Sequence, residues 1–90
     1  MSDERYRIVL KKSVLKDIRK IPAVILRRIQ EEIVSLAENP FPNGVESIQG
    51  YARHYRIRIG NYRVVYEVAT QVRIITIIRI GHRQKVYREL

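Results

Sequence analysis

The stretch "YRIRIGNYRVVY", residues 55–66, decides the fold, because two alternating runs of residues meet at Gly60-Asn61. Gly and Asn tolerate the positive φ angles that two-residue hairpin turns need, so the stretch predicts a β-hairpin. A two-residue loop places the apolar residues in pairs on one side of the sheet: Ile59 opposite Tyr62, Ile57 opposite Val64, and Tyr55 opposite Tyr66. We expect that side to pack against the core.

The other side of this hairpin is basic. The same register gives three pairs there: Arg58 with Arg63, Arg56 with Val65, and His54 with Glu67. Like charges directly opposite each other destabilise a sheet by about a few tenths of a kcal/mol. The Arg58–Arg63 pair therefore favours an anion site, above all one for a phosphate that guanidinium groups grip in bidentate fashion. In the alternative interpretation the long side chains splay into solvent at little cost. A one-residue slip in register would turn Arg58 toward the core, which disfavours the slip.

The charge of the chain is uneven. Eighteen Lys and Arg against nine Asp and Glu give a net charge of +9 and a pI near 10.4. Residues 1–50 hold nine basic and seven acidic residues, whereas residues 51–90 hold nine basic and two acidic ones. This asymmetry indicates an anion-binding surface, with nucleic acid as the leading candidate. A charge that serves solubility alone is the alternative interpretation.

Several classes of protein are excluded by composition. The chain has no cysteine, so it has no disulfide, thiol nucleophile or thiolate metal site, as is typical of a reducing cytoplasm. Its first ten residues, "MSDERYRIVL", lack the apolar stretch of a signal peptide, and the most apolar window, residues 74–80, is too short to span a bilayer. Two histidines without clustered acids predict no metal site, and no cofactor is expected. We expect a soluble, cytoplasmic protein without a membrane partner.

The remaining pattern predicts an α+β fold in one domain, residues 1–90. Strands are expected over residues 5–10, 51–59, 62–68 and 72–80. A short helix is expected over residues 11–20, followed by a second one that begins at Pro22 and carries an apolar stripe of Ile25, Ile29, Ile33 and Leu36. "NPFPNG", residues 39–44, then breaks the chain. The order βααβββ predicts a helical hairpin packed on one face of a small, mostly antiparallel sheet.

The last strand and the tail extend the basic side. A three-residue turn over residues 69–71 would pair Glu67 with Arg73 and place Ile75, Ile77 and Arg79 on the side of Arg63. The chain then enters "GHRQKVY", residues 81–87. We therefore expect His82, Arg83, Lys85 and Tyr87 near one end of the arginine-bearing side.

These features together resemble the RelE/ParE superfamily of bacterial and archaeal toxins, and the RelE branch in particular. The resemblance rests on the βααβββ order, on "NPFPNG" before the sheet, on "YRIRIGNYRVVYEV" and on the ending "GHRQKVY", and it covers nearly the whole chain. It implies a toxin that cleaves messenger RNA in the ribosomal A site, where the ribose 2′-hydroxyl attacks the adjacent phosphate. It also implies an antitoxin that wraps around the toxin and blocks its site.

The resemblance also implies roles for individual residues. Arg56 and Arg58 match the two basic strand residues near the scissile phosphate, and Arg63 matches the arginine that holds it. Arg83 matches the residue that stabilises charge at the leaving group, and Tyr87 the aromatic residue that stacks on or orients a base. Further RNA contacts are expected at basic or polar positions on the first helix, the sheet and the tail: Lys12, Lys16, Arg19, His54, Arg79 and Lys85. For the helical residues, a plain solvated face is the alternative.

One departure from the family affects the chemistry. The best-known RelE members have lysines where Arg56 and Arg58 stand, and arginine stabilises charge but cannot act as a proton acceptor. The candidates for proton transfer are then His82, His54 and Tyr87. For each the alternative is structural: a solvated His82, a cross-strand polar pair of His54 with Glu67, and packing of Tyr87 on the domain.

The sequence thus predicts a ribosome-dependent endoribonuclease. Its expected partners are an acidic antitoxin, partly disordered before it binds, and the ribosome with bound messenger RNA. Two alternatives remain open: a ParE-like inhibitor of DNA gyrase, which needs no catalytic phosphate site, and a nucleic-acid-binding subunit without catalytic activity.

Overall fold

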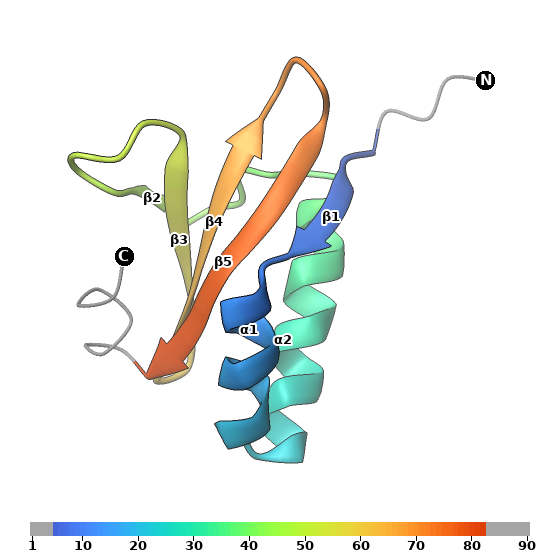
Figure 1. Cartoon of the computed structure of the whole chain (residues 1–90), viewed down its shortest axis with the longest axis vertical. Helices are drawn as coiled ribbons and strands as arrows, with labels where there is room; N and C mark the ends of the chain where they lie inside the picture. The colour runs from blue at the N-terminus through green and yellow to red at the C-terminus, as the bar shows by residue number, and fades with distance from the viewer. Residues whose placement is uncertain (1–4, 83–90) are drawn as a thin grey trace.

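Two α-helices, a short 3₁₀ helix and five strands form within residues 5–82, the part of the chain that this computed structural model describes (Figure 1). In chain order they are β1 (Arg7–Leu10), α1 (Lys12–Asp17), η1 (Ile18–Lys20), α2 (Ala23–Leu36), β2 (Glu46–Ser47), β3 (His54–Ile59), β4 (Tyr62–Ala69) and β5 (Ile74–His82). The helices pack on a mixed sheet, which confirms the predicted α+β class. Neither α-helix in this part of the chain has the length and apolar composition needed to cross a membrane.

The predicted register of the central hairpin is confirmed. Ile59 pairs with Tyr62, Ile57 with Val64 and Tyr55 with Tyr66. Gly60 takes a φ of 60°, whereas Asn61 keeps a negative φ, so only the first turn residue uses the left-handed region. A positive φ at the first turn residue alone is typical of a type II′ turn, whose twist matches that of the flanking strands.

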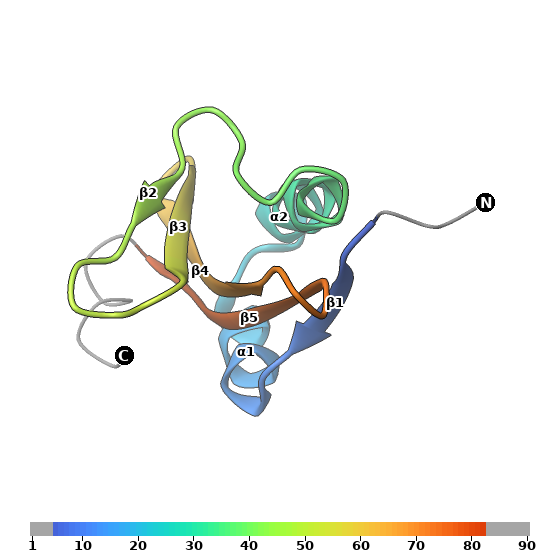
Figure 2. The same cartoon turned by 90° about the horizontal axis from the view of Figure 1, so that it is seen from above.

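The sheet has the order β1-β5-β4-β3-β2, in which β1 runs parallel to β5 and the other neighbours are antiparallel. Helix α2 covers one face of this sheet, and α1 lies next to β5 (Figure 2). The predicted stripe of α2 is the reason: Ile29, Ile33 and Leu36 are buried, and Ile25 packs against them. They meet the apolar side of the hairpin and of β5 in one cluster, which includes Ile57, Val64, Tyr66, Ile75 and Ile77.

Helix α1 completes an edge of the sheet. Strand β1 pairs with β5 as far as Leu10 opposite Ile77, and the chain then turns into α1. There the Ser13 hydroxyl donates a hydrogen bond to the Ile78 carbonyl at 2.7 Å. The buried Asp17 carboxylate accepts one from the Ile80 N–H at 2.9 Å and lies 3.1 Å from Arg79 Nη2. Two side chains thus bind backbone groups that would otherwise be left open at a strand edge.

The loop between α2 and β2 is fixed to the core by an aromatic residue. The Tyr66 hydroxyl donates a hydrogen bond to the buried Pro40 carbonyl at 2.7 Å, and the Phe41 ring meets the Tyr55 ring edge-on at 5.0 Å. Burial, with a smaller contribution from nearby Tyr55, raises the pKa of Tyr66, so its hydroxyl keeps its proton and remains a donor. "NPFPNG" therefore does more than end α2, because its contacts with the core also position β2 beside β3.

Strand β2 was not predicted, and several predicted strand bounds were wrong. Residues 51–53 form a turn rather than the start of β3, and Arg53 has a φ of 61°. Strand β5 begins at Ile74 and continues through His82. The predicted strands are correct in the centre of each segment and wrong at the ends. Arg53 and Arg73 have positive φ angles just before β3 and β5, and alternation of residue types does not predict such a backbone.

The predicted pairing of β4 with β5 was also wrong. Ala69 pairs with Ile74, so the turn spans residues 70–73 and Glu67 lies opposite Thr76, not Arg73. Ile75 and Ile77 consequently face the helices instead of sharing the side of Arg63. A register shift between Val65 and Tyr66 inserts one extra residue in β5, and this bulge returns Arg79 to the side of Arg63, as predicted.

We expect Asp17→Ala to lower the free energy of unfolding by about 2–4 kcal/mol, because it removes a buried carboxylate from Arg79 and from the Ile80 N–H. Urea unfolding followed by circular dichroism measures this change. Lys16→Ala on the exposed side of the same helix is the control and should change stability by less than about 0.5 kcal/mol. Equal losses in the two variants would contradict the role given to Asp17.

Candidate anion-binding site

The arginine face is the side of β3 and β4 that carries Arg56, Arg58 and Arg63. Arg58 lies directly opposite Arg63, and Arg56 lies opposite the buried Val65. The Arg58 side chain is 66% exposed and that of Arg56 26%, so these guanidinium groups remain accessible above a closed apolar surface. The predicted placement of the three arginines on one side of the hairpin is therefore confirmed.

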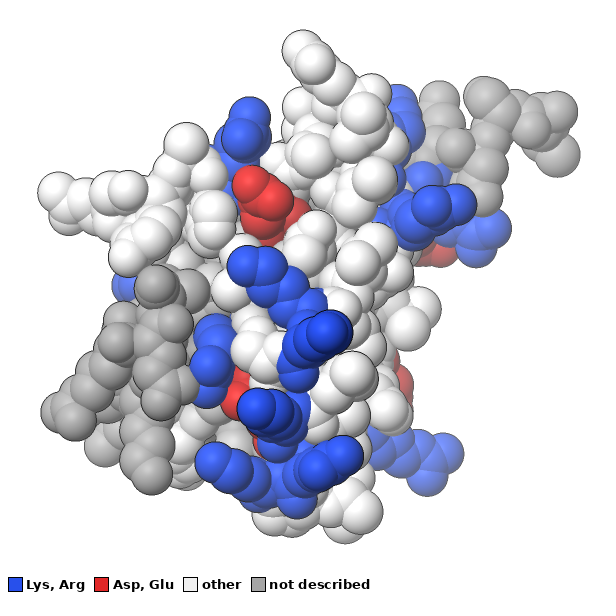
Figure 3. Space-filling view, in the orientation of Figure 1, with Lys and Arg blue, Asp and Glu red and all other residues white. Residues whose placement is uncertain are grey.

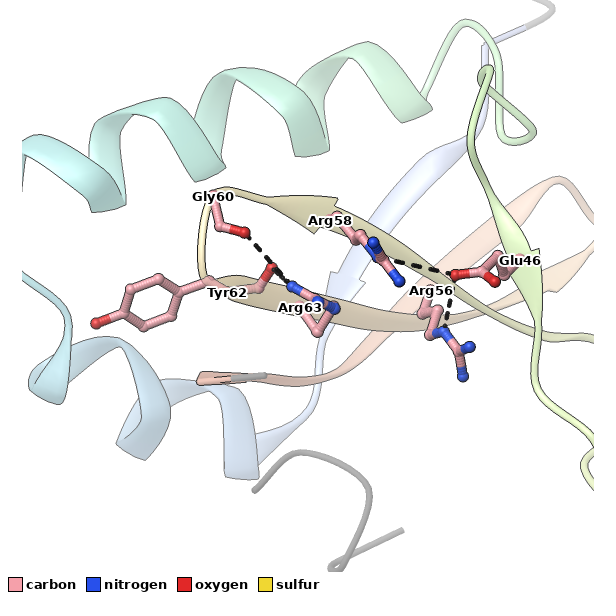
Figure 4. Close-up of polar contacts among 6 residues, drawn as sticks. All are labelled: Glu46, Arg56, Arg58, Gly60, Tyr62 and Arg63. Carbon is pink, nitrogen blue, oxygen red and sulfur yellow. Dashed lines mark hydrogen bonds and ion pairs between the residues drawn. The ribbon is translucent and has the colours of Figure 1, made fainter. Parts of the chain in front are cut away.

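An acidic residue that the sequence analysis missed joins this face. Strand β2 pairs with β3 so that Glu46 stands opposite Arg56. Glu46 Oε1 lies 3.3 Å from Arg56 Nε and 4.0 Å from Arg58 Nε, so one carboxylate serves two arginines (Figure 4). A signal was available, because Glu46 is the only acidic residue between Glu38 and Glu67. What the sequence lacked was any sign that a two-residue strand would pair here.

Arg63 is held differently. Its Nη1 donates to the carbonyls of Tyr62 and Gly60, at 3.1 and 3.4 Å, which keeps the guanidinium group folded against the turn (Figure 4). Among residues 5–82, no acidic side chain lies within ion-pair distance of Arg63. In the described part of the chain, the arginine face thus carries three guanidinium groups with one carboxylate, that of Glu46, close to two of them, and Glu67 lies farther along the same side, opposite His54. This excess of guanidinium groups is suited to a phosphate.

The two histidines lie on opposite sides of the sheet. His82 pairs with Tyr62, which lies on the side of the sheet that packs against the core. The centroids of the two rings are 5.4 Å apart. We had expected His82 near one end of the arginine face, but the structure places it on the other side of the sheet. His54 does lie on it, opposite Glu67, and its Nδ1 is 2.8 Å from the Ala52 carbonyl.

The other predicted contact residues fall into three groups. Arg79 is on the side of Arg63 but is bound to Asp17, so it links α1 to the sheet. Lys12, Lys16 and Arg19 are exposed on α1 and η1. Arg83, Lys85 and Tyr87 lie outside the described residues. Figure 3 shows Lys and Arg side chains crowded on the face in view, with few acidic side chains among them.

Comparisons with known proteins show the family of the chain. A family model described as "ParE toxin of type II toxin-antitoxin system, parDE" matches residues 8–87. The putative toxin RelE1 of Methanocaldococcus jannaschii is 34% identical over 87 residues, which cover 93% of this chain and 97% of that protein. Toxin RelE3 of the same organism is also 34% identical, over 85 residues that cover 90% of this chain and 94% of the relative. The archaeal RelE–RelB complex from Pyrococcus horikoshii contains a chain with a TM-score of 0.79 and 30% identity, covering 90% of this chain and 98% of that one.

We expect inorganic phosphate to stabilise the folded protein through the arginine face. A ligand that binds only the folded state raises the free energy of unfolding in proportion to the logarithm of its concentration. Thermal unfolding in a phosphate series should show this rise for the wild type and a clearly smaller one for Arg58→Gln. Without phosphate, Arg58→Gln should be as stable as the wild type or more so, because the like-charge pair is gone.

Arg28→Gln is the matched control, since it removes the same charge from the exposed side of α2. It should keep the full response to phosphate. An equal response in Arg58→Gln and Arg28→Gln would show that phosphate acts on net charge and not on the arginine face.

Proposed function

The chain belongs to the RelE/ParE superfamily of toxins from type II toxin–antitoxin systems, and we propose that it is a ribosome-dependent endonuclease that cleaves messenger RNA. The observation that carries the proposal is the placement of Arg56, Arg58 and Arg63 on one side of the hairpin. An inhibitor that acts only by binding a protein surface has no need of a like-charge pair next to the hairpin turn.

The arginine face supplies the electrostatic part of the reaction. Arg58 and Arg63 bind the non-bridging oxygens of the scissile phosphate, and Arg56 adds a third positive charge. The ribose 2′-hydroxyl attacks the phosphorus, and the bond to the 5′-oxygen of the next nucleotide breaks. Negative charge builds up on the phosphoryl oxygens during this step, so fixed guanidinium groups stabilise the transition state more than the ground state.

Glu46 supplies the proton acceptor that the arginines cannot provide. It is the carboxylate within 3.3 Å of Arg56 Nε, and Arg56 and Arg58 hold its Oε1 at the edge of the phosphate site. A 2′-hydroxyl next to a phosphate held by these arginines lies within reach of this oxygen. We assign the proton-accepting role to Glu46 and not to His82, because His82 lies on the other side of the sheet.

The rest of the proposal follows the resemblance to RelE toxins. Arg83 stabilises the leaving oxygen, and Tyr87 stacks on a base. Residues 1–90 act as one toxin domain in the cytoplasm, where the ribosome presents the message. An antitoxin blocks the arginine face, in line with the relative from Pyrococcus horikoshii that was solved as a RelE–RelB complex. The excess of positive charge after residue 50 favours an acidic segment of that partner.

A second function has one observation in its favour. The matching family model is described by the ParE toxin, whereas the relatives are named RelE. A ParE-like protein would inhibit DNA gyrase and would not cut RNA. A supercoiling assay separates the two functions, because inhibition of gyrase without cleavage of translated messages would support the second.

We expect Arg63→Ala to reduce cleavage of a translated message by about 100-fold or more, because it removes a charge aimed at the reacting phosphate. Primer extension on messages from an in vitro translation reaction measures the cuts. Arg28→Ala, with the same charge removed far from the arginine face, should cleave like the wild type. Cleavage by a folded Arg63→Ala variant at the wild-type rate would remove Arg63 from the site.

We expect Glu46→Gln to slow single-turnover cleavage by about 100-fold or more, because an amide cannot accept the proton. Stabilisation by phosphate should be kept or increased, because a negative charge next to the anion is gone. A folded variant that cleaves at the wild-type rate would show that another group takes the proton.

A further inference from the structure

We propose that Tyr51 and His54 form a stacking subsite for a nucleobase of single-stranded RNA, beside the phosphate site. The inference rests on the proposed function, since it takes RNA as the ligand. It concerns a contact on the sheet, separate from the tail residues and from the arginines, and it gives the exposed tyrosine of the loop before β3 a role.

The two rings lie together in the open. Their centroids are 5.6 Å apart and their planes are inclined by 48°. Tyr51 is 46% exposed, and His54 is partly exposed. A tyrosine beside a histidine offers a broad π surface, and aromatic side chains next to basic residues are the usual means by which proteins bind single-stranded nucleic acid.

The histidine ring is held in place. Its Nδ1 lies 2.8 Å from the Ala52 carbonyl, which can only accept a hydrogen bond, so Nδ1 carries a proton. In the neutral form Nε2 is then the acceptor and is available to a donor on a base or a ribose. Because the ring has one fixed orientation, little side-chain freedom is lost when a base stacks against it.

The backbone of the loop is held as well. The Ile48 N–H donates to the His54 carbonyl at 2.9 Å, and the Tyr51 N–H donates to the Ile48 carbonyl at 3.2 Å. The Val68 N–H donates to the Arg53 carbonyl at 3.0 Å, which ties the loop to β4. These bonds close a compact turn and bring Tyr51 back over His54.

The subsite lies in line with the phosphate site. His54, Arg56 and Arg58 alternate along β3, so they share a face of the sheet, with about 7 Å between successive positions. His54 is therefore about 14 Å from Arg58 along the strand, which is the length of about two nucleotide steps. The acidic residue opposite His54, Glu67, is 3.9 Å from Arg53 Nη2, so its negative charge is partly offset. A strand whose phosphate binds at Arg58 can therefore place a base about two nucleotides away at the ring pair.

The test uses a short, labelled 2′-O-methyl oligoribonucleotide, which cannot be cleaved because it lacks the attacking hydroxyl. Fluorescence anisotropy measures its affinity for the full chain. We expect Tyr51→Ala to weaken binding by about 10- to 100-fold and Tyr51→Phe to bind within about 2-fold of the wild type, since only the first loses the stacking surface. Val72→Ala, which trims an exposed apolar residue in the turn between β4 and β5, should bind like the wild type.

Abasic probes locate the contact. A probe that lacks one base, placed at each position in turn, should bind the wild type more weakly at one position than at the others. That penalty should vanish in Tyr51→Ala, whereas Arg63→Ala should weaken every probe alike. The inference is overturned if Tyr51→Ala binds as the wild type does, if the abasic penalty is the same in both proteins, or if the wild type does not bind the probe.

Failure of the proposed function would look different. A wild type that shows the Tyr51-dependent penalty but does not cut translated messages would keep the stacking subsite and exclude the endonuclease. A wild type that cuts messages while Tyr51→Ala binds every probe unchanged would exclude the subsite and keep the endonuclease.

Discussion

Arg58 can face Arg63 only because a two-residue turn joins β3 to β4, with Gly60 supplying the left-handed φ. This turn sets which residues pair, and side chains alternate along each strand, so the same register buries Ile57 and Ile59 and packs the partly buried Tyr55 against the core. The arginine face is thus the other side of the surface that forms the core. A one-residue change of register would turn an arginine toward the core under α2. The stability of the fold and the position of the charges therefore depend on the same register.

The sheet edges explain how distant parts of the chain reach this hairpin. On one side, β1 and then α1 cover β5, with Ser13 and Asp17 bound to its backbone. On the other side, β2 pairs with β3. Each protects strand groups from open exposure, and each also places a charged side chain. Asp17 holds Arg79, while Glu46 reaches Arg56. Edge protection and the arrangement of charge are therefore achieved by the same short segments.

Glu46 gives the arginine face two states. With no anion present, its carboxylate partly neutralises Arg56 and Arg58, which relieves the repulsion among the guanidinium groups. Ion pairs this exposed contribute only about 0–1 kcal/mol to stability. A phosphate can therefore replace Glu46 as the partner of the arginines at a small cost in free energy. The carboxylate then remains beside the bound phosphate, where the proposed proton transfer needs it. The same exposure makes the face accessible to an acidic segment of a partner protein.

What the sequence by itself determined is local. Alternation around Gly60-Asn61 was enough for the register of the hairpin, and the spacing of Ile25, Ile29, Ile33 and Leu36 was enough for α2, because both patterns follow from the geometry of a single element. The family resemblance rested on the hairpin stretch, on the order of the elements and on the short motifs "NPFPNG" and "GHRQKVY".

Only the tertiary structure decided where distant segments meet. Glu46 lies in a strand of two residues, too short to leave a periodic pattern, and it pairs because the Tyr66–Pro40 hydrogen bond fixes the preceding loop. The side of His82 depends on a longer turn and on a bulge in β5, and neither feature has a residue type that demands it. The placement of the three arginines on one side of the hairpin could thus be predicted from local alternation. The acid beside them could not, because its position depends on non-local pairing.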